Sequence, residues 1–93
     1  MLERNIERIV TKYALNQGFL SYKFTSPNNR GVPDRIFISP KGQIIFVEFK
    51  QKGKWLTRLQ NFIFNKLETR GCKIYVANDV LEGMAILDKY KEG

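Results

Sequence analysis

The sequence predicts an α/β fold in which a mixed β-sheet is flanked by helices. Three observations support this prediction. Apolar residues recur at helical spacing in three stretches, other stretches are typical of strands, and the elements follow one another in the order αβββαβα. Since hairpin and helical connections both occur between the strands, the sheet should contain antiparallel and parallel neighbours.

The first helix and the first strand are predicted in the N-terminal quarter of the chain. Apolar side chains recur three or four positions apart over residues 2–16, and Gly18 can end this helix. Apolar and polar side chains then alternate over residues 20–25, a pattern that favours a half-buried strand.

The next two strands are predicted to form a hairpin. Turn-forming residues make SPNNRGVP, 26–33, a loop, and Asp34 leads into a strand over residues 35–39. The tight turn PKGQ, 40–43, connects this strand to the next one, 44–50.

The C-terminal part alternates between helix and strand. Thr57 with Gln60, and Asp79 with Glu82, have the spacing of capping pairs that begin helices. The predicted elements are a basic loop at 51–56, a helix ending at Gly71, a strand at 73–77 and a last helix to about Tyr90.

The composition excludes several classes of function. The 93 residues, 43% of them hydrophobic, suit a single domain spanning residues 1–93. The chain has no histidine and only one cysteine, Cys72. Histidine-dependent catalysis, histidine-ligated zinc sites and an intrachain disulfide are therefore excluded. Any hydrolytic chemistry should depend on carboxylates, lysine and a divalent metal.

The net charge bears on the binding partner, and the lack of an apolar membrane span and of a signal-peptide core bears on the location of the protein. A formal charge of +7 favours a polyanionic partner, most simply nucleic acid, although an ordinary basic protein fits the charge equally well. No apolar run approaches the roughly 20 residues that span a bilayer, and MLERNIER at the N-terminus lacks the core of a signal peptide. A lone thiol suits a reducing compartment. We therefore expect an intracellular, cytoplasmic protein with no membrane association.

Charged residues at the end of an apolar strand indicate a site. Within 44–50, Glu48 and Lys50 share one face of the strand, because side chains alternate between the two faces. A glutamate in such a strand is costly unless it is exposed, paired or bound to metal. The hairpin places Asp34 opposite a position close to Glu48 or Phe49. Both carboxylates can thus meet at one end of the sheet.

Such a group of residues has a chemical use. Two carboxylates with water oxygens suit Mg²⁺ or Mn²⁺, and a lysine can oppose charge that develops on a phosphodiester. The alternative is an exposed sheet end, since the pattern of Glu48 and Lys50 alone occurs by chance in many proteins.

The motif Pro33-Asp34 followed by Glu48-Phe49-Lys50 resembles the signature of the PD-(D/E)xK nuclease superfamily. The wider stretch 22–60 is similar to its VRR-NUC branch, the virus-type replication-repair nucleases. The resemblance covers nearly the whole chain. It implies a standalone, minimal VRR-NUC domain with a restriction-endonuclease-like αβββαβ core and an additional C-terminal helix.

The resemblance also implies roles for individual residues. Asp34 and Glu48 would bind Mg²⁺ or Mn²⁺ together with the backbone carbonyl of Phe49, and Lys50 would be the catalytic lysine. Gln60 would belong to the active-site face, although helix capping explains this glutamine equally well. A glutamate of the first helix would complete the catalytic and metal site, with Glu7 favoured and Glu3 in reserve.

Other basic residues and one aromatic residue are candidates for contact with DNA. Trp55 can stack on an unpaired base, but we expect it to anchor its loop to the core. Phosphate contacts are expected from side chains around the proposed metal, with ordinary solvated charge as the alternative; the candidates are Lys23, Arg30, Arg35, Lys52 and Lys54.

The resemblance predicts a metal-dependent endonuclease that cuts branched DNA, such as Holliday junctions, during replication, repair or recombination. The alternatives are a non-catalytic nucleic-acid-binding module and a flap or restriction-type nuclease. A homodimer is expected, because paired cuts in a junction require two sites. Its candidate surfaces are the strand 20–25 and the apolar positions of the first and last helices, including Ile86 and Leu87, whereas a monomeric core is the alternative.

Overall fold

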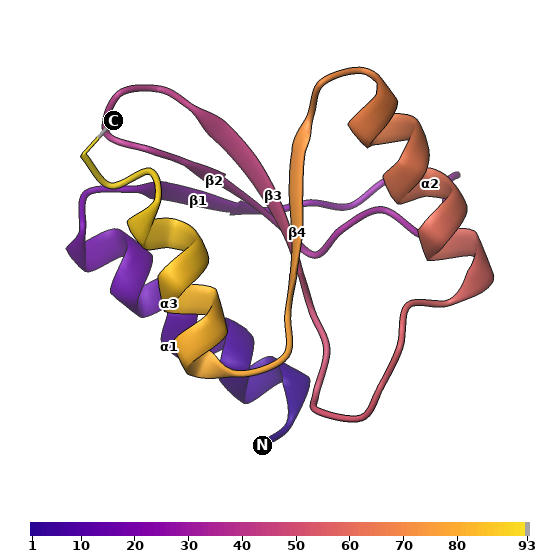
Figure 1. The fold of residues 1–93 in the computed structure, drawn as a ribbon, viewed down its shortest axis with the longest axis horizontal. Helices are drawn as coiled ribbons and strands as arrows, with labels where there is room; N and C mark the ends of the chain where they lie inside the picture. Colours follow the sequence, from indigo (N-terminus) through magenta and orange to yellow (C-terminus); the bar gives the residue numbers. More distant parts are fainter. Residues whose placement is uncertain (93) are drawn as a thin grey trace.

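The computed structural model describes residues 1–92 and contains one mixed sheet with helices on both faces (Figure 1). Gly93, the last residue of the predicted domain, lies outside the described residues. The element order matches the prediction, and the elements are α1 (Glu3–Asn16), β1 (Leu20–Lys23), β2 (Arg35–Ile38), β3 (Ile44–Phe49), α2 (Arg58–Thr69), β4 (Lys73–Ala77) and α3 (Val80–Asp88).

The sheet is mixed, as the connections predict. Its strands lie in the order β1-β2-β3-β4; the first three are antiparallel neighbours, and β4 runs parallel to β3. The α2 crossover makes the parallel pairing possible. Three predicted strands are longer than the observed ones, since β1 ends at Lys23, β2 at Ile38 and β3 at Phe49. Differences of one or two residues are usual where pairing ends.

The hairpin turn between β2 and β3 fixes the register of the two strands. Ser39 donates its N–H to the carbonyl of Gln43 at 2.8 Å, and its hydroxyl accepts the N–H of Gln43 at 3.0 Å. Gly42 lies at φ +88, a conformation that glycine adopts without strain. In the resulting register Arg35 faces Val47. One step further along both strands, Asp34 faces Glu48.

The core lies between the sheet and the pair of helices α1 and α3. Ile45, Val47 and Phe49 of β3 are fully buried and pack with residues of both helices. The two helices approach so closely at Gly83 that an added Cβ would lie 2.6 Å from Cγ2 of Val10. Ile86 and Leu87 are part of this core. The prediction that they offer a dimer surface was therefore wrong, because a small sheet needs the whole apolar face of its last helix for cover.

Helix α2 covers part of the opposite face of the sheet and packs along β4 (Figure 1). The loop before β2 passes beside this helix, where Gly31 lies close to Leu59 and Ile63. Farther along the same face, apolar side chains of β1 and β3 remain exposed. Among residues 1–92, no helix combines the length and apolarity that crossing a membrane requires.

Candidate active site

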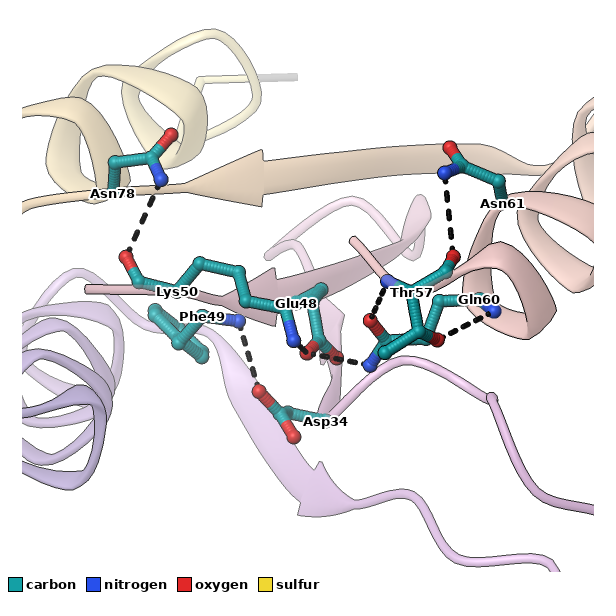
Figure 2. Close-up of polar contacts among 8 residues, drawn as sticks. All are labelled: Asp34, Glu48, Phe49, Lys50, Thr57, Gln60, Asn61 and Asn78. Atoms are coloured by element: carbon teal, nitrogen blue, oxygen red, sulfur yellow. Dashed lines mark hydrogen bonds and ion pairs between the residues drawn. The ribbon is translucent and has the colours of Figure 1, made fainter. Parts of the chain in front are cut away.

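Asp34 and the end of β3 meet at one end of the sheet (Figure 2). Asp34 precedes β2, and its Oδ2 accepts the backbone N–H of Phe49 at 2.8 Å. The N–H and the carbonyl of one residue in an antiparallel strand face the same neighbouring strand. The carbonyl of Phe49 is therefore on the Asp34 side of β3, where the prediction needs it.

Glu48 is almost completely buried, with 3% of its surface exposed. Its Oε2 atom accepts a hydrogen bond from Nε2 of Gln60 at 3.1 Å and lies 3.5 Å from Nζ of Lys50. The other oxygen, Oε1, is buried without a hydrogen-bond partner. A buried carboxylate oxygen normally has a partner, and a cation could provide one for this atom.

Burial and mutual repulsion disfavour the ionised forms of the Asp34 and Glu48 carboxylates. Burial, and after it the charge of Asp34, raises the pKa of Glu48 to about 7 against the opposing effects of Lys50 and Gln60. Burial also raises the pKa of Asp34, and the hydrogen bond from Phe49 opposes that rise. A cation between the two groups would remove the repulsion and favour both charged forms.

The donor set fits a small, hard divalent cation rather than a zinc cluster. It consists of two carboxylates and a backbone carbonyl, all oxygen donors, as Mg²⁺ and Mn²⁺ prefer. Within residues 1–92, no three side chains of histidine, cysteine, aspartate or glutamate gather closely enough to hold a metal ion. Water would have to supply the remaining ligands, which is usual for Mg²⁺.

Gln60 has both of the functions that the sequence left open. Its Oε1 accepts the backbone N–H of Thr57 at 2.9 Å, and Thr57 Oγ1 accepts the N–H of Gln60 at 3.1 Å, so the capping box is complete. Its Nε2 is the donor to Glu48. One side chain thus begins α2 and orients a buried carboxylate.

Comparison with known proteins gives a sequence relative and two related folds. No family model matches the chain. A protein named "Putative nuclease p44", from Acyrthosiphon pisum secondary endosymbiont phage 1, is 45% identical over 58 residues, which is 62% of this chain and 62% of that protein. The match therefore spans less than two thirds of the relative's length.

The solved structures decide the fold. One described as a VRR_NUC domain has a TM-score of 0.87 at 22% identity and covers 95% of this chain and 96% of that chain. Another, a VRR_NUC domain protein, has a TM-score of 0.82 at 16% identity, with 99% of this chain and 89% of that chain covered. The chain has the VRR_NUC fold. The resemblance drawn from the sequence motif is confirmed at this level.

In this VRR_NUC fold, Glu7 lies near Asp34 but is already paired with two cations. Its Oε2 is 2.7 Å from Nζ of Lys23 and 2.7 Å from Nε of Arg35. Arg35 also donates to Oγ of Ser21 at 3.2 Å. The charges of Glu7 and Glu3 both raise the pKa of Asp34, so the start of α1 lies near this carboxylate. The side chains of Lys23 and Arg35 are thereby held beside the site.

Lys50 is fixed to β4 of the VRR_NUC fold by a contact that the sequence analysis missed. Its backbone N–H donates to the carbonyl of Ala77 at 3.0 Å, and Nδ2 of Asn78 donates to the Lys50 carbonyl at 3.4 Å (Figure 2). Asn78 follows the strand parallel to β3. Only knowledge of that parallel pairing could have indicated its position.

The other predicted DNA-contacting residues of the VRR_NUC fold lie on the surface. Arg30, Lys52 and Lys54 are exposed, Arg30 in the loop before β2 and the two lysines in the loop after β3. Trp55 is 86% exposed. The prediction that it anchors its loop to the core was wrong, because the indole is largely solvent-exposed and lines a surface depression with residues such as Val76 and Asn61.

Proposed function

We propose that the chain is a metal-dependent DNA endonuclease that hydrolyses phosphodiester bonds with Mg²⁺ or Mn²⁺. The observation that carries this proposal is Glu48, a buried carboxylate with Asp34 on one side, Lys50 on the other and one oxygen without a partner. A module that only bound nucleic acid would have no use for two carboxylates where phosphate approaches. The name of the phage relative and the VRR_NUC fold agree with a nuclease.

The proposed ligands are Asp34, Glu48 and the Phe49 carbonyl, completed by water. A divalent ion in this position would stabilise the negative charge that develops during phosphodiester hydrolysis and lower the pKa of water. Glu7, which the sequence analysis favoured over Glu3, is not included among these ligands, since Lys23 and Arg35 neutralise its charge. Its contribution would be to hold these two cations beside the incoming phosphate.

Lys50 and Gln60 would orient the reacting groups. The Lys50 side chain is 13% exposed, so its ammonium is mostly shielded from water yet remains beside the surface. Charge interactions are stronger in such surroundings. The ammonium can face the phosphate oxygens as they gain charge, while Gln60 keeps Glu48 in place.

We further propose branched DNA as the substrate and a homodimer as the active form, because two symmetric sites can cut two strands of one junction. The surface proposed for pairing is the open part of the sheet face. Leu20, Tyr22 and Ile44 are each more than half exposed, and Leu20 and Ile44 lie in one row with Ile38 between them. Burial of these side chains by a second copy would be favourable.

The decisive experiment measures single-turnover cleavage of labelled four-way junction, flap, single-stranded and linear duplex DNA with Mg²⁺, Mn²⁺ or EDTA. We expect the wild type to cut with either ion and not with EDTA. Asp34→Asn and Glu48→Gln should abolish cleavage and leave binding unchanged or tighter, because they also remove repulsion against phosphate. Wild-type rates in either variant at millimolar Mg²⁺ would overturn the two-carboxylate site.

The dimer is tested separately by sedimentation equilibrium at micromolar concentration. We expect twice the chain mass of 10.9 kDa. Tyr22→Lys should shift the mass toward the monomer, whereas Leu81→Lys, an exposed apolar residue on α3 at 79% exposure, is the matched control. A monomeric wild type that still makes paired cuts would show that the DNA, not a preformed dimer, coordinates the two sites.

A further inference from the structure

Trp55 is not part of the buried core. It is the most exposed of the large hydrophobic side chains among residues 1–92, at 86%. An indole that a fold could bury contributes roughly 2–3 kcal/mol when it does so. The chain forgoes this stabilisation at a loop that joins two parts of the candidate active site, Lys50 and the Thr57–Gln60 capping box.

The loop has a defined shape that presents its charges. The N–H of Lys54 donates to the carbonyl of Gln51 at 3.0 Å and closes a four-residue turn. Gly53 occupies the third position at φ +87, as in a type II turn. Lys52 and Lys54 are exposed on either side of this glycine. Two ammonium groups therefore precede the indole of Trp55 in the chain, and Lys54 comes directly before it.

A depression of about 370 Å³ lies beside the indole, bounded by the loop, by Asn61 of α2 and by Val76 and Asn78 at the end of β4. Both asparagines are held by backbone carbonyls, Asn61 by that of Thr57 and Asn78 by that of Lys50. The same Asn78 therefore borders the depression and contacts the proposed catalytic lysine. Figure 2 shows both asparagines on the β4 side of Glu48 and Asp34 on the other side.

We propose that Trp55 is a stacking platform for an unpaired nucleobase, with Lys52 and Lys54 on the adjoining phosphates. An exposed aromatic side chain next to cations is a combination by which proteins bind single-stranded nucleic acid. Duplex DNA offers no free base face, so the platform selects substrates with unpaired nucleotides next to the cleaved bond. The inference rests on the proposed nuclease function for the class of ligand, and it assigns the loop as the specificity element of that site.

The chain contains a single tryptophan, so its fluorescence reports on this residue alone. The experiment titrates the protein in EDTA with a short oligothymidylate and, separately, with a blunt duplex of the same length. We expect quenching by the oligothymidylate and little by the duplex. Equal quenching by both, or none with either, would overturn the proposal.

Variants test the same point through affinity, measured by anisotropy of labelled DNA. Trp55→Ala should weaken binding to the oligothymidylate by about 5- to 150-fold, the cost of losing one stacked base, and leave duplex binding unchanged. Trp55→Phe should restore much of the loss. Phe62→Ala, which removes another exposed aromatic at 59% exposure, is the matched control and should change neither affinity. A parallel loss for both DNAs in Trp55→Ala would overturn the stacking role.

Failure of this inference can be distinguished from failure of the proposed nuclease. If the wild type cleaves DNA with metal but its fluorescence does not change with unpaired DNA, the proposed nuclease is supported and the stacking platform is refuted. If unpaired DNA quenches selectively but no metal supports cleavage, the platform is supported and the nuclease is refuted. A blue shift that grows with protein concentration in the absence of DNA would mean that a second copy covers Trp55, and this result would also overturn the proposal.

Discussion

Gln60 joins the start of helix α2 to the carboxylate of Glu48. Its Oε1 accepts the Thr57 N–H at 2.9 Å, and its Nε2 donates to Oε2 of Glu48 at 3.1 Å. Helix stability and the geometry of the candidate site are therefore coupled through one amide group. The coupling can be separated experimentally, because Thr57 contributes to the helix start but not to Glu48.

Thr57→Ala should destabilise the protein by about 1 kcal/mol and leave cleavage largely unchanged, because it removes only the side-chain cap. Gln60→Ala should cost a similar amount of stability and also slow cleavage, since Glu48 loses its neutral donor. Chemical denaturation and single-turnover rates on both variants check this. If both variants slowed cleavage equally, the effect of Gln60 would come from the helix and not from Glu48.

Stability should depend on pH in the absence of metal. The pKa of Glu48 is raised in the folded protein from 4.5 to about 7. The folded state therefore holds a proton that the unfolded state releases. The resulting stabilisation is fully present below about pH 4.5 and is lost as the pH rises toward 7, by roughly 2–3 kcal/mol. Urea denaturation in EDTA between pH 4.5 and 8 measures the decline.

Glu48→Gln should flatten this decline, because the amide does not titrate, and should make the metal-free protein more stable than the wild type at pH 8. If the stability of this variant depended on pH as much as that of the wild type, a group other than Glu48 would be responsible for the decline.

Millimolar Mg²⁺ should raise the melting temperature of the wild type at pH 8, and EDTA should reverse the increase. A ligand that binds only the folded state stabilises it by mass action. The increase should be smaller at pH 6, since the proton on Glu48 competes with the ion. Asp34→Asn and Glu48→Gln should abolish it. An equal increase in these variants would mean that the ion binds at another place.

Lys50→Ala should slow the single-turnover rate by about 100-fold, the order of loss when one group that stabilises transition-state charge is removed. Affinity for the same DNA should change much less, because the interaction is strongest in the transition state. Lys41→Ala is the matched control, since that lysine is exposed in the hairpin turn at the opposite end of β3. A variant that lost affinity and kept its rate would assign Lys50 to DNA binding.

Gly83→Ala should destabilise the protein by about 1–3 kcal/mol, because the new Cβ would lie 2.6 Å from Cγ2 of Val10 in a packed helix contact. Val10→Ala in the same chain should recover part of the loss, and the double-mutant cycle from thermal denaturation gives the coupling. Additive effects would mean that α1 and α3 can separate at low cost.

The sequence predicted the meeting of Asp34 and Glu48 because a short hairpin links them. Once the turn at PKGQ is recognised, strand geometry leaves only a one-residue choice of register, and the hydrogen bonds of Ser39 select it. The capping box at Thr57 was predictable for the same reason, since three-residue spacing determines its contacts.

Contacts across the parallel pair were not predictable in this way. The position of Asn78 beside Lys50 depends on how β4 aligns with β3 after the α2 crossover, and no local pattern determines that alignment. The exposure of Trp55 was predicted wrongly, because a large apolar residue in a loop is expected to be buried when the rest of the fold is not known.

Strand β3 pairs with β2 on one side and β4 on the other, and the chain segment that must form a loop is longer for the pairing with β4. Asp34 reaches Phe49 through a hairpin, whereas the Lys50 carbonyl meets Asn78 only after the whole α2 crossover has been ordered. Closing the longer loop costs more entropy and slows the formation of those contacts. During folding, the acidic pair should therefore come together before the lysine is fixed. A nascent chain would present the proposed cation site before it could position the lysine proposed to act on phosphate.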